Sequence, residues 1–246
     1  MRSRFFAAAT AVLLTACSGS GGGSTSGSTG TADAGDPVAV LGLQAGACYE
    51  FTDSEVASNP AALGMAVESD TTNAIWYLAD GGSATVAART LVYRERGTKR
   101  MTDYLYVDGS DLLLLKRDVA GAEESDYQPA LVVARLPLKN ADHFDESGAV
   151  REFGTDAGSD PQPYVFAFDV SRAPVQTPIS PDGGFDAFTY AYSGDPSRLQ
   201  SIGFAVGTGI VQASVGFPDD TGAPVYLLQN TRQLSAGDQT CGSAVP

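Results

Sequence analysis

Residues that commonly carry catalytic or metal chemistry are few in this 246-residue chain. His143 is the only histidine, and its surroundings, NADHFDESG, predict a solvated loop and not a general base. The chain has neither the G-K-[ST] of a phosphate-binding loop nor the G-x-S-x-G of a nucleophile elbow. Gly207-Thr208-Gly209 begins like a dinucleotide fingerprint, but Gln212 replaces the third glycine and a β pattern follows. That favours a close backbone approach or a strand kink. We expect no catalytic residue, no cofactor and no metal site.

Carboxylates are the one abundant reactive group, with 29 Asp and Glu residues. A pair of them acting on a polysaccharide stays open as an alternative function, although their spacing singles out no pair. The clusters DGSD (108–111) and GAEESD (121–126) are typical of solvated turns. TDAGSDPQ and SPDGGFD match a calcium loop only in part.

Aromatic side chains are the candidates for ligand contact. Trp76 and Tyr77, with Tyr104 and Tyr106, would line a concave site for a sugar or a lipid if they face one cavity, and otherwise they belong to the core. The aromatic residues that we consider as possible ligand-facing groups are Trp76, Tyr104, Tyr106, Phe166, Phe168 and Tyr190.

The elements that must hold these side chains are predicted to be strands. Short β-branched and aromatic runs recur between Gly, Asp and Pro, and long helical periodicity is missing from residue 37 onward. Only 53–66 and 139–149 suggest a helical turn or short helix. The predicted strands are 48–52, 73–79, 84–95, 102–107, 111–117, 130–136, 164–170, 185–192, 201–207, 209–215 and 224–230.

Turns and alternation predict how these strands are arranged. Asp108-Gly109 is typical of a type I′ hairpin turn, and 80–82 and 219–222 are further hairpin connections, so neighbouring strands are antiparallel. Tyr164, Phe166 and Phe168 alternate with smaller or polar residues and predict an aromatic inner face. We expect an all-β fold with a single antiparallel, strongly curved meander sheet or open half barrel and few short helices.

The N-terminal residues are typical of a secretory leader. Arg2 and Arg4 precede the apolar run 5–14. Ten apolar residues reach about 15 Å as a helix, half of a ~30 Å hydrocarbon core, so we do not expect a membrane span. Loss of residues 1–16 removes both arginines and no acid, which changes the net charge from −14 to −16. An anionic surface of this size argues against a nucleic-acid partner.

The end of the leader, Leu14-Thr15-Ala16-Cys17, resembles the lipobox of bacterial lipoproteins. The resemblance implies cleavage before Cys17, lipidation of its thiol and anchoring in a membrane; the alternative is an ordinary leader cut beside a cysteine. Ser18 stands where the family carries Asp as an inner-membrane retention signal, which implies the outer membrane, on its periplasmic face or at the cell surface. Residues 18–36 have no large apolar side chain and predict a flexible tether with a reach of roughly 24 Å.

With Cys17 lipidated, Cys48 and Cys241 are left. In an exported chain they are most simply one disulfide, and the alternative is two unpaired buried thiols. We therefore divide the chain into a signal peptide (1–16), a lipidated cysteine with its tether (17–36) and a β-rich domain (37–246).

Two segments resemble uncharacterised envelope proteins with a Lol-type half-barrel domain. They are LQAGACYEF near residue 48 and IGFAVGTGIVQASVGFPDDTGAPVYLLQNTRQL near the C-terminus, where Val206 replaces the proline that is usual in that family. The resemblance transfers no binding residue. We expect a non-enzymatic binding or assembly module for an apolar ligand, such as a lipid, or for an envelope protein partner. An envelope hydrolase and a purely structural lipoprotein are the alternatives.

Overall fold

The computed structural model of the chain describes residues 35–53, 63–78, 80–95, 97–121, 123–154, 160–177, 180–194, 199–218 and 224–234. The predicted leader, Cys17, Cys241 and the turn at 219–222 lie outside these ranges. The described elements are α1 (Pro37–Val40), β1 (Cys48–Asp53), β2 (Leu63–Tyr77), β3 (Ser83–Glu95), β4 (Thr98–Asp108), β5 (Asp111–Val119), β6 (Glu123–Arg135), β7 (His143–Gly154), β8 (Gln162–Val175), β9 (Phe185–Ser193), β10 (Leu199–Ala205), β11 (Gly209–Pro218) and β12 (Pro224–Leu234).

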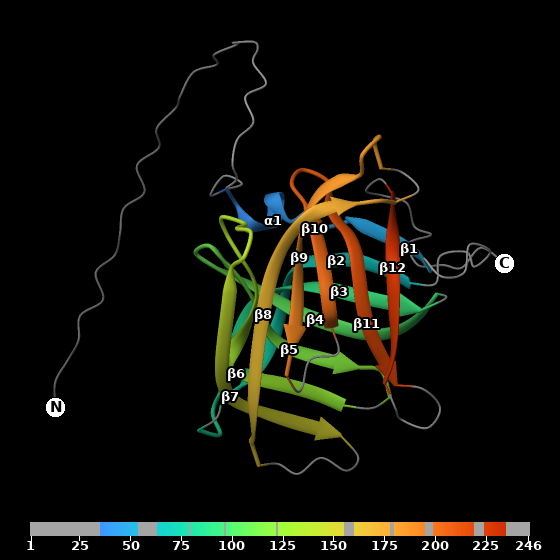
Figure 1. Ribbon diagram of the computed structural model, residues 1–246. Helices are drawn as coiled ribbons and strands as arrows, with labels where there is room; N and C mark the ends of the chain where they lie inside the picture. The colour runs from blue at the N-terminus through green and yellow to red at the C-terminus, as the bar shows by residue number, and fades with distance from the viewer. Residues whose placement is uncertain are drawn as a thin grey trace, which may run out of the picture.

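The strands form one antiparallel meander, as predicted. From β2 to β12 each strand pairs with the next one in sequence. β1 pairs with β12 on one side and with β2 on the other, so the curved sheet closes into a barrel (Figure 1). Closure goes further than the open half barrel expected from the sequence, because the strand that would form one edge also pairs with the last strand.

Alternation along the strands places the aromatic face inside the barrel, as predicted. In β8, Tyr164, Phe166, Phe168 and Val170 are buried, whereas the residues between them are exposed or half-buried. The turn between β4 and β5 differs in detail from the expectation. Gly109 has φ = 60°, but Ser110 does not have a positive φ. A type I′ turn needs a positive φ at both central residues, whereas a type II′ turn needs it only at the first, so this turn matches type II′.

β7 was not predicted, and the helical turns suggested at 53–66 and 139–149 are wrong where the structure describes them. Residues 63–66 begin β2 and residues 143–149 lie in β7. β7 carries little hydrophobic signal because its outer face, with His143, Asp145 and Ser147, is solvent-exposed. Its opposite face holds Glu146 and Gly148 among its residues, so the usual alternation of apolar and polar residues is weak.

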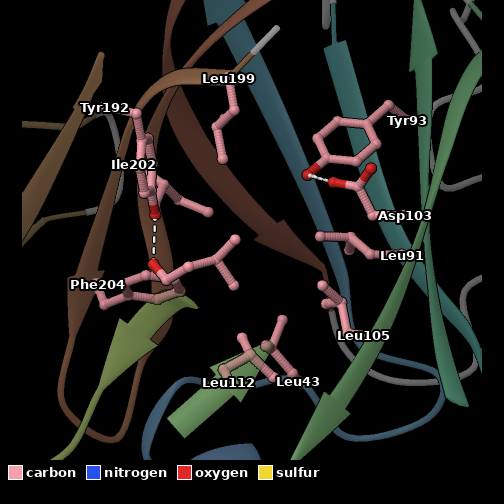
Figure 2. Close-up of a pocket in the computed structure, with 11 residues that line it drawn as sticks. Leu43, Leu91, Tyr93, Asp103, Leu105, Leu112, Tyr192, Leu199, Ile202 and Phe204 are labelled. Atoms are coloured by element: carbon pink, nitrogen blue, oxygen red, sulfur yellow. Dashed lines mark hydrogen bonds between the residues drawn. The ribbon is translucent and has the colours of Figure 1, made fainter. Parts of the chain in front are cut away.

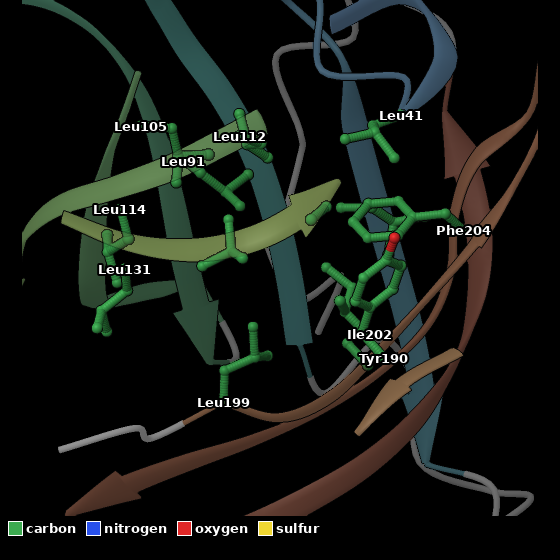
Figure 3. Packing of buried hydrophobic residues seen from close by; sticks show 14 of the residues in the cluster. Leu41, Leu91, Leu105, Leu112, Leu114, Leu131, Tyr190, Leu199, Ile202 and Phe204 are labelled. Atoms are coloured by element: carbon green, nitrogen blue, oxygen red, sulfur yellow. The ribbon is translucent and has the colours of Figure 1, made fainter. Parts of the chain in front are cut away.

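One end of the barrel is closed by the segment that contains α1. Asp36 caps this helix by accepting a hydrogen bond from the Val38 amide at 3.0 Å. Leu41 and Leu43 then enter the core, where Leu41 lies near Phe204 in Figure 3. The Tyr49 hydroxyl donates to the Gly42 carbonyl at 2.5 Å, and Arg89 donates to the Leu43 carbonyl at 2.9 Å.

The junction between β6 and β7 is paired along only half of its length. Glu123–Gln128 pairs with Ala149–Gly154, and the ladder stops at Pro129, which has no N–H to donate. Beyond it, tyrosine hydroxyls from β8 and β9 donate to β6 carbonyls: Tyr164 to Pro129 at 2.8 Å, Tyr192 to Val133 at 2.6 Å and Tyr190 to Arg135 at 3.1 Å. These three tyrosines, which we call the seam tyrosines, satisfy backbone acceptors that a neighbouring strand would otherwise satisfy.

Gly148→Ala tests how tightly the end of this ladder is packed. A Cβ at Gly148 would stand 2.8 Å from Pro129 Cδ and 2.8 Å from Tyr164 Cζ, and would also meet the Gln128 carbonyl. We expect the free energy of unfolding in urea to fall by about 2–3 kcal/mol, as for other overpacked sites. Ser147→Ala, at the exposed neighbouring position, should change it by less than about 0.5 kcal/mol. Equal effects of the two substitutions would contradict the tight packing.

Candidate functional site

The candidate site is a polar cluster in the interior of the barrel. Tyr93, Asp103 and Arg117 come from the neighbouring strands β3, β4 and β5 and are 1%, 2% and 3% exposed. Arg117 donates from Nε to Asp103 Oδ1 at 2.6 Å and from Nη2 to Oδ2 at 2.9 Å. The Tyr93 hydroxyl donates to Asp103 Oδ2 at 2.9 Å (Figure 2). Asp103 and Arg117 are direct cross-strand partners, so the β4–β5 register sets this geometry.

Electrostatics fix the protonation of the two donors in this cluster. Burial raises the pKa of Tyr93 well above its ordinary value, and the negative charge of Asp103 raises it further. Burial by itself would lower the pKa of Arg117, but the carboxylate of Asp103 more than offsets this and raises it. Tyr93 is thus a fixed donor and Arg117 a fixed cation, and both hold the Asp103 carboxylate as their acceptor. The arrangement suits a structural ion pair better than proton transfer.

A small cavity lies beside this cluster. Figure 2 shows Tyr93 and Asp103 on one side of it, Tyr192, Ile202 and Phe204 on the other, and Leu43 and Leu112 towards its base. Its volume of about 20 Å³ accommodates roughly one water molecule. Sites for drug-sized ligands are about 300–1,000 Å³, so this space is too small for a lipid chain or a sugar ring.

Three of the six candidate aromatic residues fill the barrel core. Phe166, Phe168 and Tyr190 are buried, and the Phe168 and Tyr190 rings meet edge to face at 5.1 Å between centroids. Phe166 stacks on Tyr192 at 5.7 Å. None of the three lines the cavity beside Asp103.

The other three candidate aromatic residues lie on the outer side of the sheet. Trp76 and Tyr104 pack against a separate small cluster formed by Ala74, Ala88, Leu115 and Ala130. Tyr106 is 38% exposed. The six candidates are thus divided between the two faces of the sheet and do not form one concave surface.

A second polar cluster, which the sequence did not indicate, lies on the outer face beneath the end of β2. Lys116, Asp126 and Arg151 are cross-strand neighbours on β5, β6 and β7. Asp126 is completely buried, which corrects the interpretation of GAEESD as a solvated turn. Desolvation raises the pKa of Asp126 to about 6, although Lys116 and the Tyr77 amide act to lower it. Only the fold reveals this cluster, because its cover comes from residues about 50 positions earlier in the chain.

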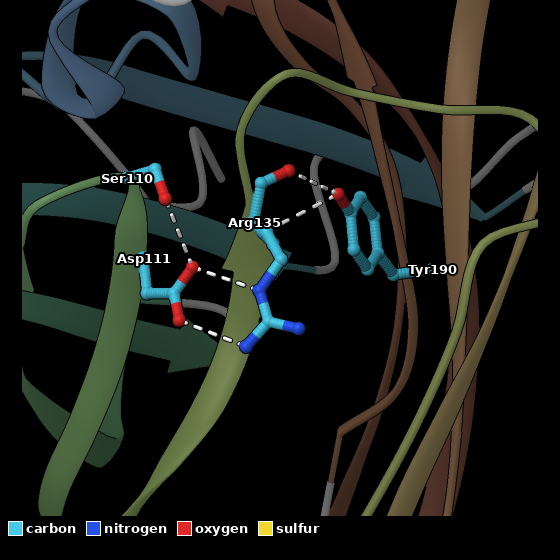
Figure 4. A network of polar contacts seen from close by, with 4 residues as sticks. All are labelled: Ser110, Asp111, Arg135 and Tyr190. Carbon is cyan, nitrogen blue, oxygen red and sulfur yellow. Dashed lines mark hydrogen bonds and ion pairs between the residues drawn. The ribbon is translucent and has the colours of Figure 1, made fainter.

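A third polar contact stabilises the end of the β5–β6 pair near the seam tyrosines. Asp111 and Arg135 form a bidentate pair, with both N–O distances at 2.9 Å, and Ser110 lies beside Asp111 (Figure 4). The Arg135 guanidinium also lies over the Phe144 ring, 4.8 Å from its centroid. Asp111, from the predicted turn DGSD, is therefore engaged within the protein.

His143 and Gly209, which the sequence analysis considered as parts of functional motifs, both make contacts within the barrel structure. His143 begins β7, is 57% exposed and contacts Asp169 Oδ1 through Nδ1 at 2.8 Å on the outside of the barrel. Gly209 has φ = 91°, and a Cβ there would meet the Tyr49 ring, so this glycine permits the close approach that its motif favoured. Within the described ranges, no three His, Cys, Asp or Glu side chains are grouped to hold a metal ion.

Comparison of the chain with known protein families, curated proteins and solved structures finds no match. Among the described residues, no helix has the length and apolar character needed to cross a membrane.

The interior ion pair generates a stability prediction. Asp103→Asn leaves the Arg117 charge buried without its counterion, and we expect a loss of about 3–5 kcal/mol of unfolding free energy in urea. The double variant Asp103→Leu with Arg117→Met removes both charges and should recover most of that loss. As a control, Asp186→Ala breaks the solvent-exposed pair with Arg172 and should cost less than about 1 kcal/mol. A cost for Asp103→Asn no greater than that of the control would refute a structural role for the pair.

Proposed function

We propose that this chain is a lipid-anchored protein of the bacterial outer membrane whose barrel is a non-enzymatic binding or assembly module for an envelope protein partner. The observation that carries the proposal is the order of residues before the barrel. A short apolar run ends at Leu14-Thr15-Ala16-Cys17, and a Gly, Ser and Thr tether then leads to Pro37. Lipid at Cys17 would place the barrel at a membrane surface, with the tether allowing it to reach a partner.

The packing of the barrel supports a protein partner over an apolar ligand. The interior is filled by aromatic and aliphatic side chains, and the cavity beside Asp103 has a volume of only about 20 Å³. Contacts with another molecule would then be made by the outer surface, where Ile75, Val165 and Val206 are exposed apolar residues.

The same packing gives no support to a hydrolase with paired carboxylates. Asp103 is the carboxylate that lines the described cavity, and both of its oxygens accept hydrogen bonds from Arg117 or Tyr93. A catalytic acid or base needs a carboxylate that is free to exchange a proton with substrate.

Lipidation is tested by expressing the full chain and its Cys17→Ser variant in a bacterial host. The native chain should separate with membranes and carry the added mass of acyl chains on Cys17. The variant should be soluble after cell lysis, because tether and barrel would then have no acyl anchor. Equal membrane association of both proteins would rule out Cys17 as the anchor.

The partner form of the proposal is tested on the soluble Cys17→Ser chain and on the anchored chain in cells. Native mass spectrometry of the soluble chain should find no bound lipid, because the cavity beside Asp103 is too small for one. A photo-crosslinking residue at Val165, which is exposed, should give a discrete protein adduct in the envelope. The same residue placed at Thr85, on the β2–β3 hairpin, serves as the comparison site. Co-purified lipid without an adduct would favour the apolar-ligand function instead.

The proposal also includes a disulfide between Cys48 and Cys241. Cys48 is buried at the first residue of β1. We expect the intact mass of the Cys17→Ser chain to rise by the mass of two hydrogen atoms on reduction, and the thermal stability of the chain to fall. An unchanged mass would show that the two thiols are unpaired.

A further inference from the structure

The far end of the β2–β3 hairpin leaves the barrel wall and docks on β6. We call residues 72–88 the hairpin tip. Irregular pairing between Val67 and Thr72 separates this tip from the part of the hairpin that belongs to the barrel. In the order of the sheet, β3, β4 and β5 lie between β2 and β6, so the contact between β2 and β6 is not part of the ladder.

Four contacts hold the tip on β6 and its neighbour. Trp76 Nε1 donates to the Tyr127 carbonyl at 3.0 Å, and Gln128 Nε2 donates to the Tyr77 carbonyl at 3.2 Å. The Tyr77 amide donates to Asp126 Oδ1 at 3.4 Å. The Tyr77 ring also meets Phe153 of β7, with 4.9 Å between centroids. Among these contacts, only the one to Asp126 involves a group that ionises near neutral pH.

The apolar contact beneath the tip is small. Its buried members are Ala74, Ala88, Leu115 and Ala130, and Trp76 at its margin is only partly buried. Val86, Tyr104 and Leu113 also pack against this cluster but are only partly buried, so the polar contacts add to a modest hydrophobic contribution in docking.

The carboxyl group of Asp126 is incompletely hydrogen-bonded in this contact. It is completely buried, and its Oδ2 has no hydrogen-bond partner among the described residues. The charged groups that face it are Lys116 of β5, Glu124 of β6 and Arg151 of β7. Lys116 is already paired with Glu124 at 2.8 Å, and Arg151 Nε has no hydrogen-bond partner within the described part of the chain. The tip offers Asp126 only a backbone amide, since Asp80 in the turn is the sole charged residue between 72 and 88.

We infer that the hairpin tip is a proton-controlled latch, docked on β6 while Asp126 is neutral and released as Asp126 ionises.

The direction follows from linkage. In the docked state desolvation raises the pKa of Asp126 to about 6, whereas the lifted tip exposes the carboxyl to water and returns it towards the ordinary value of about 4. The docked state therefore binds the proton more tightly. Docking is strongest below pH 4, and the docking equilibrium constant falls by up to about 100-fold between pH 4 and pH 6.

Trp76 is the only tryptophan of the chain and lies at the latch, so its fluorescence reports docking directly. We would record the emission maximum and acrylamide quenching of the full chain between pH 4 and pH 8. The native protein should show stronger quenching and a red shift as the pH rises, with most of the change between pH 4 and pH 6. Asp126→Asn, which remains neutral, should stay protected at every pH. Asp108→Asn, at an exposed position at the end of β4, should titrate like the native chain.

Gln128→Ala provides an independent variant if Asp126→Asn does not fold. It removes one docking bond without a titrating group, so Trp76 should be more strongly quenched throughout while the response to pH persists. Far-UV circular dichroism should stay constant over the same range, which separates release of the tip from unfolding. A flat native profile, an unchanged titration in Asp126→Asn, or unchanged quenching in Gln128→Ala would overturn the latch.

Discussion

Closure of the sheet is the constraint on which the rest of this structure depends, and it rests on β1. This short strand pairs with β2 along one side and with β12 along the other. Without it, β2 and β12 would each present a row of unpaired backbone groups, which are costly in a folded protein and promote aggregation. The segment before β1 also helps to hold the barrel closed. Leu41 and Leu43 enter the core, and the Tyr49 hydroxyl of β1 donates a hydrogen bond to the Gly42 carbonyl.

Closure also determines what the interior can hold. The inward side chains of twelve strands converge on one space, and here they are large: Tyr and Phe from β8 and β9 meet Leu and Val from β5 and β6. The hydroxyls of the seam tyrosines serve as backbone donors where the β6–β7 ladder ends. The rings of these tyrosines fill part of the barrel interior, and their hydroxyls satisfy backbone carbonyls of β6. Because the same side chains do both, enlarging the interior by truncating them would also expose β6 acceptors.

The strands and their order follow from local sequence patterns, whereas the polar clusters do not. Alternation in YVFAFDV and the Gly-containing turns predicts antiparallel strands with an aromatic inner face, and both are found. β7 escapes prediction because it places Glu146 and Gly148 on the face opposite its exposed one. The pairing of Asp103 with Arg117 depends on the β4–β5 register, which a one-residue shift would abolish. Trp76 resembles a ligand-binding aromatic in sequence, yet it lies on the outer face, where it packs against the small cluster that contains Ala74 and Ala88.

Asp103 and Asp126, two of the buried carboxylates, show why burial alone does not define a site. Asp103 receives two hydrogen bonds from a guanidinium and one from a phenol, so its charge is compensated within the same strands that bury it. Asp126 is buried by a hairpin tip that brings one amide at 3.4 Å and no cation. The cost of desolvating a charge must be met by its partners or reduced by neutralising it. Arg117 and Tyr93 compensate the charge of Asp103, whereas Asp126 lacks such partners in the ranges that the structure describes and its raised pKa favours the neutral form. The position of the tip is thereby coupled to a proton.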